Sequence, residues 1–130
     1  MGRRILKAKK IVIPIYEAYV TFIYSNSYEA IEEYATKDDI GEQTLELLKK
    51  RGYEGYHIPL HDGDIEEYYL IVKKTTNKYD EIDTITHEIS HLVIDILNSA
   101  GVKFNKNNDE PYAHLTGYLN KEFFKFKDGK

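Results

Sequence analysis

The chain has 130 residues, of which 42% are hydrophobic, and its formal net charge is −4. This length and composition predict a single domain over 1–130 with one ordinary hydrophobic core. No apolar run approaches the ~18 residues that span a membrane, and the basic arm over 1–10 lacks the apolar stretch of a secretory signal. The negative charge argues against specific nucleic-acid binding. Because the chain has no cysteine, nitrogen and oxygen atoms must supply the ligands of any zinc site.

A small sheet is predicted from the first half of the chain. β-branched and aromatic residues dominate 10–24 and predict one or two strands, and residues 68–72 predict another. Three glycines and Pro59 predict a loop or an irregular edge over 52–67.

Two short helices are predicted between these strands. Ser27 is a candidate N-cap for a helix that runs through Tyr34. Asp38 or Asp39 is a candidate start for a second helix, which Gly52 would end.

Two longer helices are predicted in the second half. Residues 80–100 have the clearest helical periodicity of the chain, and Gly101 follows where a left-handed C-terminal cap is expected. After a polar loop, Pro111 suits a first helical turn and predicts a helix over 110–125. The elements together predict an α+β fold, in which a small mixed or antiparallel sheet packs on the helix over 80–100 and on a C-terminal helix.

The helix over 80–100 contains the pattern His-Glu-x-x-His. His87 and His91 stand about 40° apart around a helix and about 6 Å apart along it, so both imidazoles can reach one ion. Glu88 lies on the flank of that pair, where a carboxylate can contact a metal-bound water without being a ligand, as a general base requires. Zinc is the cofactor that this pattern predicts.

The histidines are predicted to lie on the polar side of this helix. They share that side with Thr84, Asp95 and Asn98, whereas the apolar residues form a stripe on the other side. That stripe consists of Ile82, Ile85, Ile89, Leu92, Val93, Ile96 and Ala100. The alternative interpretation is a solvated helix face, because chance places this motif in about one or two of a hundred such chains.

A catalytic zinc site needs a third protein ligand and an open fourth position. Glu110 is the preferred candidate because it begins the next helix after a loop that can fold it back over the histidines. His114 and Asp109 are the alternatives, and Asp109 or Glu110 could instead cap the helix. Asp95, one turn beyond His91, is a candidate to orient a liganding imidazole, or else an exposed charge.

The face of Glu110 is predicted to approach the histidine helix. Ala113 and Gly117 lie on that face, where small side chains would permit a close approach. The apolar residues Leu115, Leu119 and Phe123 lie on the opposite face of the same helix.

The last third of the chain resembles a family of very small zincin-like proteins encoded by tailed bacteriophages and related bacterial elements. The similar text is His87-Glu88-x-x-His91, then Gly101-Val102-Lys103-Phe104, then Asn108-Asp109-Glu110-Pro111-x-Ala113-x-Leu115-Thr116-Gly117, with Ile13-Pro14-Ile15 near the start. The resemblance implies a reduced metallopeptidase fold with His87, His91 and Glu110 on zinc and Glu88 as the base. His114 departs from the family, where tyrosine is usual, and leaves a different ligand set open.

Two functions are consistent with this resemblance. The first is a zinc metallopeptidase of a bacteriophage that hydrolyses peptide bonds by glutamate-activated, zinc-bound water, with the peptide substrate lying along the strand 68–72. The second is a structural virion component, such as a neck or tail ring subunit, that contacts other phage proteins and has a non-catalytic metal site. The expected location is the host cytoplasm or the virion, without a membrane partner.

Overall fold

Four strands form one mixed sheet in the order β1-β2-β4-β3. They are β1 (Leu6–Ile13), β2 (Ala18–Ser25), β3 (Gly55–Asp62) and β4 (Ile65–Lys73). β1 pairs with β2 and β3 with β4 in antiparallel fashion, while β2 and β4 are parallel. The structure, a computed structural model, describes residues 3–37, 55–62, 65–103 and 105–129.

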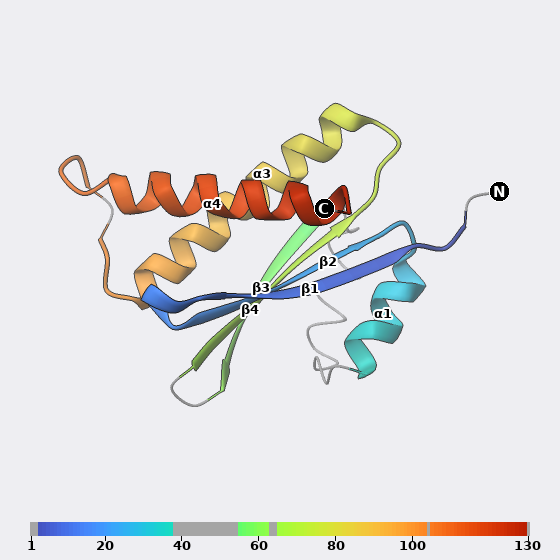
Figure 1. The fold of residues 1–130 in the computed structure, drawn as a ribbon, viewed down its shortest axis with the longest axis horizontal. Coiled ribbons are helices and arrows are strands. Elements are labelled where there is room, and N and C mark those ends of the chain that lie inside the picture. Colours follow the sequence, from blue (N-terminus) through green and yellow to red (C-terminus); the bar gives the residue numbers. More distant parts are fainter. Residues whose placement is uncertain (1–2, 38–54, 63–64, 104, 130) are drawn as a thin grey trace.

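Three α-helices and one short 3-10 helix accompany the sheet. The 3-10 helix η1 (Pro14–Tyr16) connects β1 to β2, and α1 (Tyr28–Lys37) follows β2. The long helices are α3 (Lys78–Ser99) and α4 (Glu110–Lys127). Figure 1 shows α3 and α4 crossing over one face of the sheet and α1 on the other face. The predicted α+β class, with a small sheet packed on these two helices, is confirmed.

The main core lies between the sheet and the two long helices. Alternate residues of the inner strands point into it, and they meet the apolar stripes of α3 and α4. Its members include Val20, Phe22, Tyr68, Leu70, Ile85, Ile89, Leu92, Leu115, Leu119 and Phe123. On the other face, Ile23 and Ile71 are buried, as is Ile31 of α1. The inner strands are therefore apolar on both faces, which explains their nearly continuous hydrophobic runs.

Several predicted boundaries are confirmed. Ser27 precedes α1, and its hydroxyl accepts a hydrogen bond from the Ala30 backbone N–H at 3.3 Å. Gly101 has φ of 80° directly after α3, which is the left-handed cap that the sequence predicts. The second short helix, expected between Asp38 or Asp39 and Gly52, lies outside the described residues.

Three expectations about the strands need correction. The segment 52–67 is predicted as a loop or an irregular edge, and it contains β3, an edge strand of the sheet, so the loop alternative is wrong. In the sequence of β3, Tyr56, Ile58 and Leu60 recur at every second position, and an edge strand tolerates Pro59. The basic segment 1–10 is not a free arm throughout, because β1 begins at Leu6.

The third correction concerns the strand predicted to bind peptide. Residues 68–72 belong to β4, which pairs with β2 on one side and β3 on the other. Its backbone hydrogen-bonding groups are used within the sheet, so it offers no edge for strand addition. In the described part of the chain, the edge strands of this sheet are β1 and β3.

Candidate metal centre

Helix α3 holds the His-Glu-x-x-His motif in its middle, with the two histidines turned to solvent. His87 and His91 are exposed, and their ring centroids lie 4.8 Å apart. The residues of the apolar stripe at Ile85, Ile89 and Leu92 are completely buried. The predicted division of this helix into a core side and a histidine side is therefore confirmed, except that two members of the predicted stripe, Ile82 and Ala100, are exposed.

Glu88 occupies the boundary between these two sides. Its side chain is only 6% exposed, whereas both neighbouring histidines are exposed. α3 packs on β3 and β4, and Asp95 acts electrostatically on Tyr68 of β4. Glu88 and Asp95 lie about 20° apart around the helix, so the flank that carries them faces the β3 and β4 side of the sheet.

The start of α3 is anchored by a second glutamate. Glu81 is 5% exposed, and its carboxylate accepts hydrogen bonds from the Tyr24 hydroxyl at 2.9 Å and the Thr75 backbone N–H at 2.9 Å. The Lys127 ammonium, at the end of α4, lies 3.0 Å from the same carboxylate. This network fixes the orientation of α3 relative to β2 and α4, and hence the direction in which the histidines point.

The predicted third ligands lie at the start of α4. The Glu110 carboxylate is 3.3 Å from Nε2 of His114, and both side chains are about four-fifths exposed. Together they line a groove of about 590 Å³ with Ile13, Ile15 and Tyr118. Asp109 is the N-cap residue of α4, but its side chain makes no capping hydrogen bond.

This position separates Glu110 from the histidines. Lys127, the last residue of α4, contacts Glu81 in the first turn of α3, so the two helices run in opposite directions. Within the residues that the structure describes, no group of three or more histidines and carboxylates is close enough to hold a metal ion. The structure thus brings His87 and His91 together but does not bring Glu110, His114 or Asp109 to them.

The packing of α4 explains this separation. The helix buries Leu115, Leu119 and Phe123 against the sheet and α3. The opposite face, with Ala113 and Gly117, is exposed, and no atom lies within 4 Å of a Cβ built on Gly117. The expectation that small residues bring this face close to α3 is therefore wrong, because the apolar stripe makes the contact instead.

Sequence reasoning missed a second polar cluster near the end of α3. There the buried Tyr68 hydroxyl donates a hydrogen bond to the Glu66 carboxylate, and Ser99 Oγ lies 3.4 Å from the same hydroxyl. Tyr68 was predicted as a strand residue, and alternation along β4 places it on the helix side. Glu66 belongs to the same strand, but the sequence predicts a loop or an irregular edge over 52–67 and so does not place Glu66 beside Tyr68.

The two histidines fit a metal ion as neighbouring nitrogen ligands, and the exposed face leaves room for further ligands. Among the described residues, no helix is long and apolar enough to cross a membrane. Comparisons of the chain with family models, with curated proteins and with solved structures find no match.

Proposed function

We propose that this protein is a zinc-dependent peptidase in which His87 and His91 bind the metal and Glu88 is the general base. The observation that carries the proposal is the arrangement on α3: two exposed imidazoles 4.8 Å apart and a nearly buried carboxylate on their flank. A site that served only to bind metal would need no general base. A carboxylate beside them is what proton transfer to and from a reacting group requires.

The position of β3 at the edge of the described sheet is a second observation in favour of a peptide substrate. Within the described sheet β3 pairs only with β4, so one row of its backbone hydrogen-bonding groups is open to an added strand. α3 packs on β3, with Glu88 on the flank that faces this side of the sheet. An extended peptide on β3 would therefore run beside the catalytic helix, as strand addition requires.

Each residue then has a defined task. When bound, zinc supplies Lewis-acid polarisation of the scissile carbonyl. His87 and His91 hold it on the outer side of α3. Glu88 accepts a proton from the attacking water and returns one to the leaving amine.

Glu110 remains the proposed third ligand, and its place in the structure defines how to test it. It can join the histidines only if the first turn of α4 moves relative to α3. A Glu110→Gln variant that loses zinc, while His114→Ala retains it, would assign the third ligand to Glu110. The reverse result would assign it to His114.

The central experiment is metal analysis of the purified protein and two variants, followed by cleavage assays on a peptide library. We expect one equivalent of zinc in the wild type and in Glu88→Gln, none in His91→Ala, and cleavage only in the wild type. Ser90→Ala is the matched control, because its exposed hydroxyl bonds only to the His87 carbonyl of its own helix. Zinc without cleavage would favour the structural virion component, and absence of zinc would overturn the proposal.

A further inference from the structure

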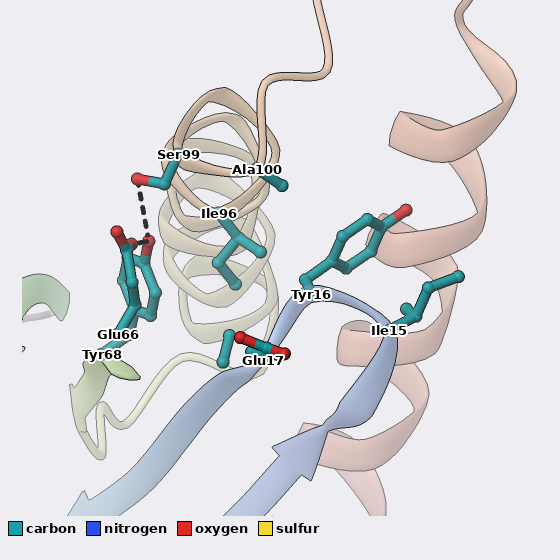
Figure 2. Close-up of a pocket in the computed structure, with 9 residues that line it drawn as sticks. Ile15, Tyr16, Glu17, Glu66, Tyr68, Ile96, Ser99 and Ala100 are labelled. Carbon is teal, nitrogen blue, oxygen red and sulfur yellow. Dashed lines mark hydrogen bonds between the residues drawn. The ribbon is translucent and has the colours of Figure 1, made fainter. Parts of the chain in front are cut away.

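An apolar groove of about 590 Å³ lies at the end of β1, between the turn that follows this strand and the first half of α4. Figure 2 shows Ile15 on that turn, with its side chain extending beside α4. Large exposed hydrophobic side chains gather here: Ile15 is 80% exposed, Val12 48% and Tyr118 41%, and all three line the groove. Apolar side chains that gather on a surface in this way are typical of an interaction site.

The strand that leads into this groove has an open edge. In the described sheet β1 pairs only with β2. The Ile5 carbonyl accepts a hydrogen bond from the Asn26 backbone N–H at 3.4 Å, whereas the Ser25 carbonyl accepts one from Lys74 at 2.7 Å, on the side of β4. Because bonded pairs alternate along an antiparallel ladder, every second residue of β1 turns its N–H and C=O groups away from β2. These residues are Leu6, Ala8, Lys10 and Val12, and an extended chain can add to their row.

The same strand carries a positive charge that is only partly compensated. The first sixteen residues of the chain contain five lysines and arginines and no acidic residue. Lys10 pairs with Glu67 at 3.2 Å. In the described part of the chain, Lys7 and Lys9 pair with no carboxylate, and Lys9 is exposed. Because side chains alternate along a strand, Lys7 and Lys9 lie on the same side of the sheet as Ile13, which lines the groove.

This distribution of charge favours an acidic partner over a second copy of the chain. Pairing of two β1 strands along their whole length would bring their lysines together, and like charges on neighbouring strands are destabilising. Carboxylates on an added strand would instead meet Lys7 and Lys9. At the groove, the Glu110 carboxylate is about four-fifths exposed and would repel them. The acidic residues of a partner therefore belong at the lysine end of β1, and an apolar residue belongs at the groove.

We propose that β1 binds an extended acidic peptide by strand addition, with one aliphatic side chain of the peptide in the groove. Residues four positions apart lie on the same face of a strand, so a peptide can place an aliphatic residue opposite Ile13 and a carboxylate opposite Lys9. The partner is therefore a segment in which an aliphatic residue and an aspartate or glutamate are four positions apart. β1 lies at the opposite edge of the sheet from β3, so the inference does not depend on zinc binding or on peptidase activity.

The test is an NMR titration of the intact protein with a capped eight-residue peptide that has leucine at its second position, aspartate at its sixth and eighth, and threonine or valine elsewhere. Leucine precedes the aspartates because an antiparallel peptide meets Ile13 before Lys9. We expect saturable shifts and slower hydrogen exchange for the outward amides of Ala8, Lys10 and Val12, and smaller changes for the Lys9 amide, which points to β2. A peptide with lysine in place of both aspartates should bind about tenfold more weakly, and added salt should weaken the acidic peptide.

Two exposed positions separate the charge from the groove. Lys9→Glu and Ile15→Ser should each weaken binding about threefold or more, and circular dichroism shows that each variant is folded. The matched controls are Lys74→Glu, an exposed lysine directly after β4, and Ile94→Ser, a 51% exposed position of α3 outside the groove. Unchanged affinity in both test variants, equal binding of the lysine peptide, or protection of β3 amides instead of β1 amides would overturn the inference. Protection of β1 that grows with protein concentration in the absence of peptide would also overturn it, because a second copy would then occupy the edge.

Discussion

Glu81 is the buried charge on which the placement of α3 depends most. Its carboxylate accepts hydrogen bonds from the Tyr24 hydroxyl of β2 and from the Thr75 backbone N–H in the loop before α3. It also pairs with the Lys127 ammonium at the end of α4. A carboxylate removed from water is tolerated only when such partners compensate its lost hydration. Removal of its charge should therefore leave Lys127 without its buried partner.

We predict that Glu81→Gln lowers the free energy of unfolding by about 1–3 kcal/mol, because the Tyr24 hydroxyl and the Thr75 N–H lose a charged acceptor and the Lys127 ammonium loses its nearest carboxylate. Urea denaturation followed by circular dichroism measures this change. Glu122→Gln is the control: Glu122 pairs with Lys125 only at 3.9 Å near the surface, so the loss should stay below about 0.5 kcal/mol. Equal losses in the two variants would refute the role given to Glu81.

Two buried tyrosines should make stability fall at alkaline pH. Burial raises the pKa of both Tyr24 and Tyr68, and the carboxylates of Glu81 and Glu66, respectively, raise them further. In the unfolded chain a tyrosine ionises near pH ~10, so above that pH the unfolded state releases protons that the folded state retains. The stabilising contribution is complete below about pH 10 and is lost as the pH rises above it.

The measurement is urea denaturation at a series of pH values from about 8 to 11. A variant with Tyr24→Phe and Tyr68→Phe should show a smaller decline above pH ~10 than the wild type, whatever its stability at neutral pH. Tyr79→Phe is the control, since Tyr79 is 78% exposed. An unchanged slope in the double variant would show that other groups cause the decline.

At the scale of elements, the start of α3 depends on Asn77. The Asn77 side-chain oxygen accepts hydrogen bonds from the backbone N–H groups of Tyr79 at 2.9 Å and Asp80 at 3.1 Å. Asn77→Ala should lower the free energy of unfolding by about 1 kcal/mol, because these N–H groups lose their partner. Asn98→Ala, on an exposed position near the end of α3, should change it by less than about 0.5 kcal/mol. Thermal unfolding of both variants distinguishes a lost cap from a general effect of removing asparagine.

The sequence predicts some elements better than others for physical reasons. α3 is predicted well because its apolar residues recur with helical spacing and Gly101 ends it. β3 is not, because its glycine, proline and aspartate are also typical of turns, and only pairing with β4 makes it a strand. The sequence also does not reveal that β4 lies inside the sheet, because the order of strands depends on long-range pairing that local patterns do not contain.

The candidate site was predictable only in its local part. His87, Glu88 and His91 belong to one helix, so their relative positions follow from helical geometry. Glu110 belongs to another helix, and its position depends on which face of α4 packs. The apolar stripe determines that face and turns Glu110 toward the groove beside Ile13 and Ile15.

At the scale of the whole molecule, the long helices shield one face of the sheet while α3 presents its outer side to solvent. α4 crosses α3 without covering the histidines, and α1 lies on the far face of the sheet (Figure 1). The hydrophobic core lies between the sheet and the long helices, and its members include neither His87 nor His91. Zinc should add to the stability of a protein that is already folded, unlike a zinc finger, which needs its metal to fold.

This difference gives a prediction for the whole protein. In zinc at a hundredfold excess over its dissociation constant, the free energy of unfolding should rise by about 2.7 kcal/mol, because zinc binds the folded state. Differential scanning calorimetry should show a Tm several degrees higher with zinc, while the metal-free protein still unfolds cooperatively. His91→Ala should abolish the rise, and Ser90→Ala should keep it. An equal rise in His91→Ala would place the zinc elsewhere, whereas a metal-free protein without a cooperative transition would show that the sheet and its helices need the metal to fold.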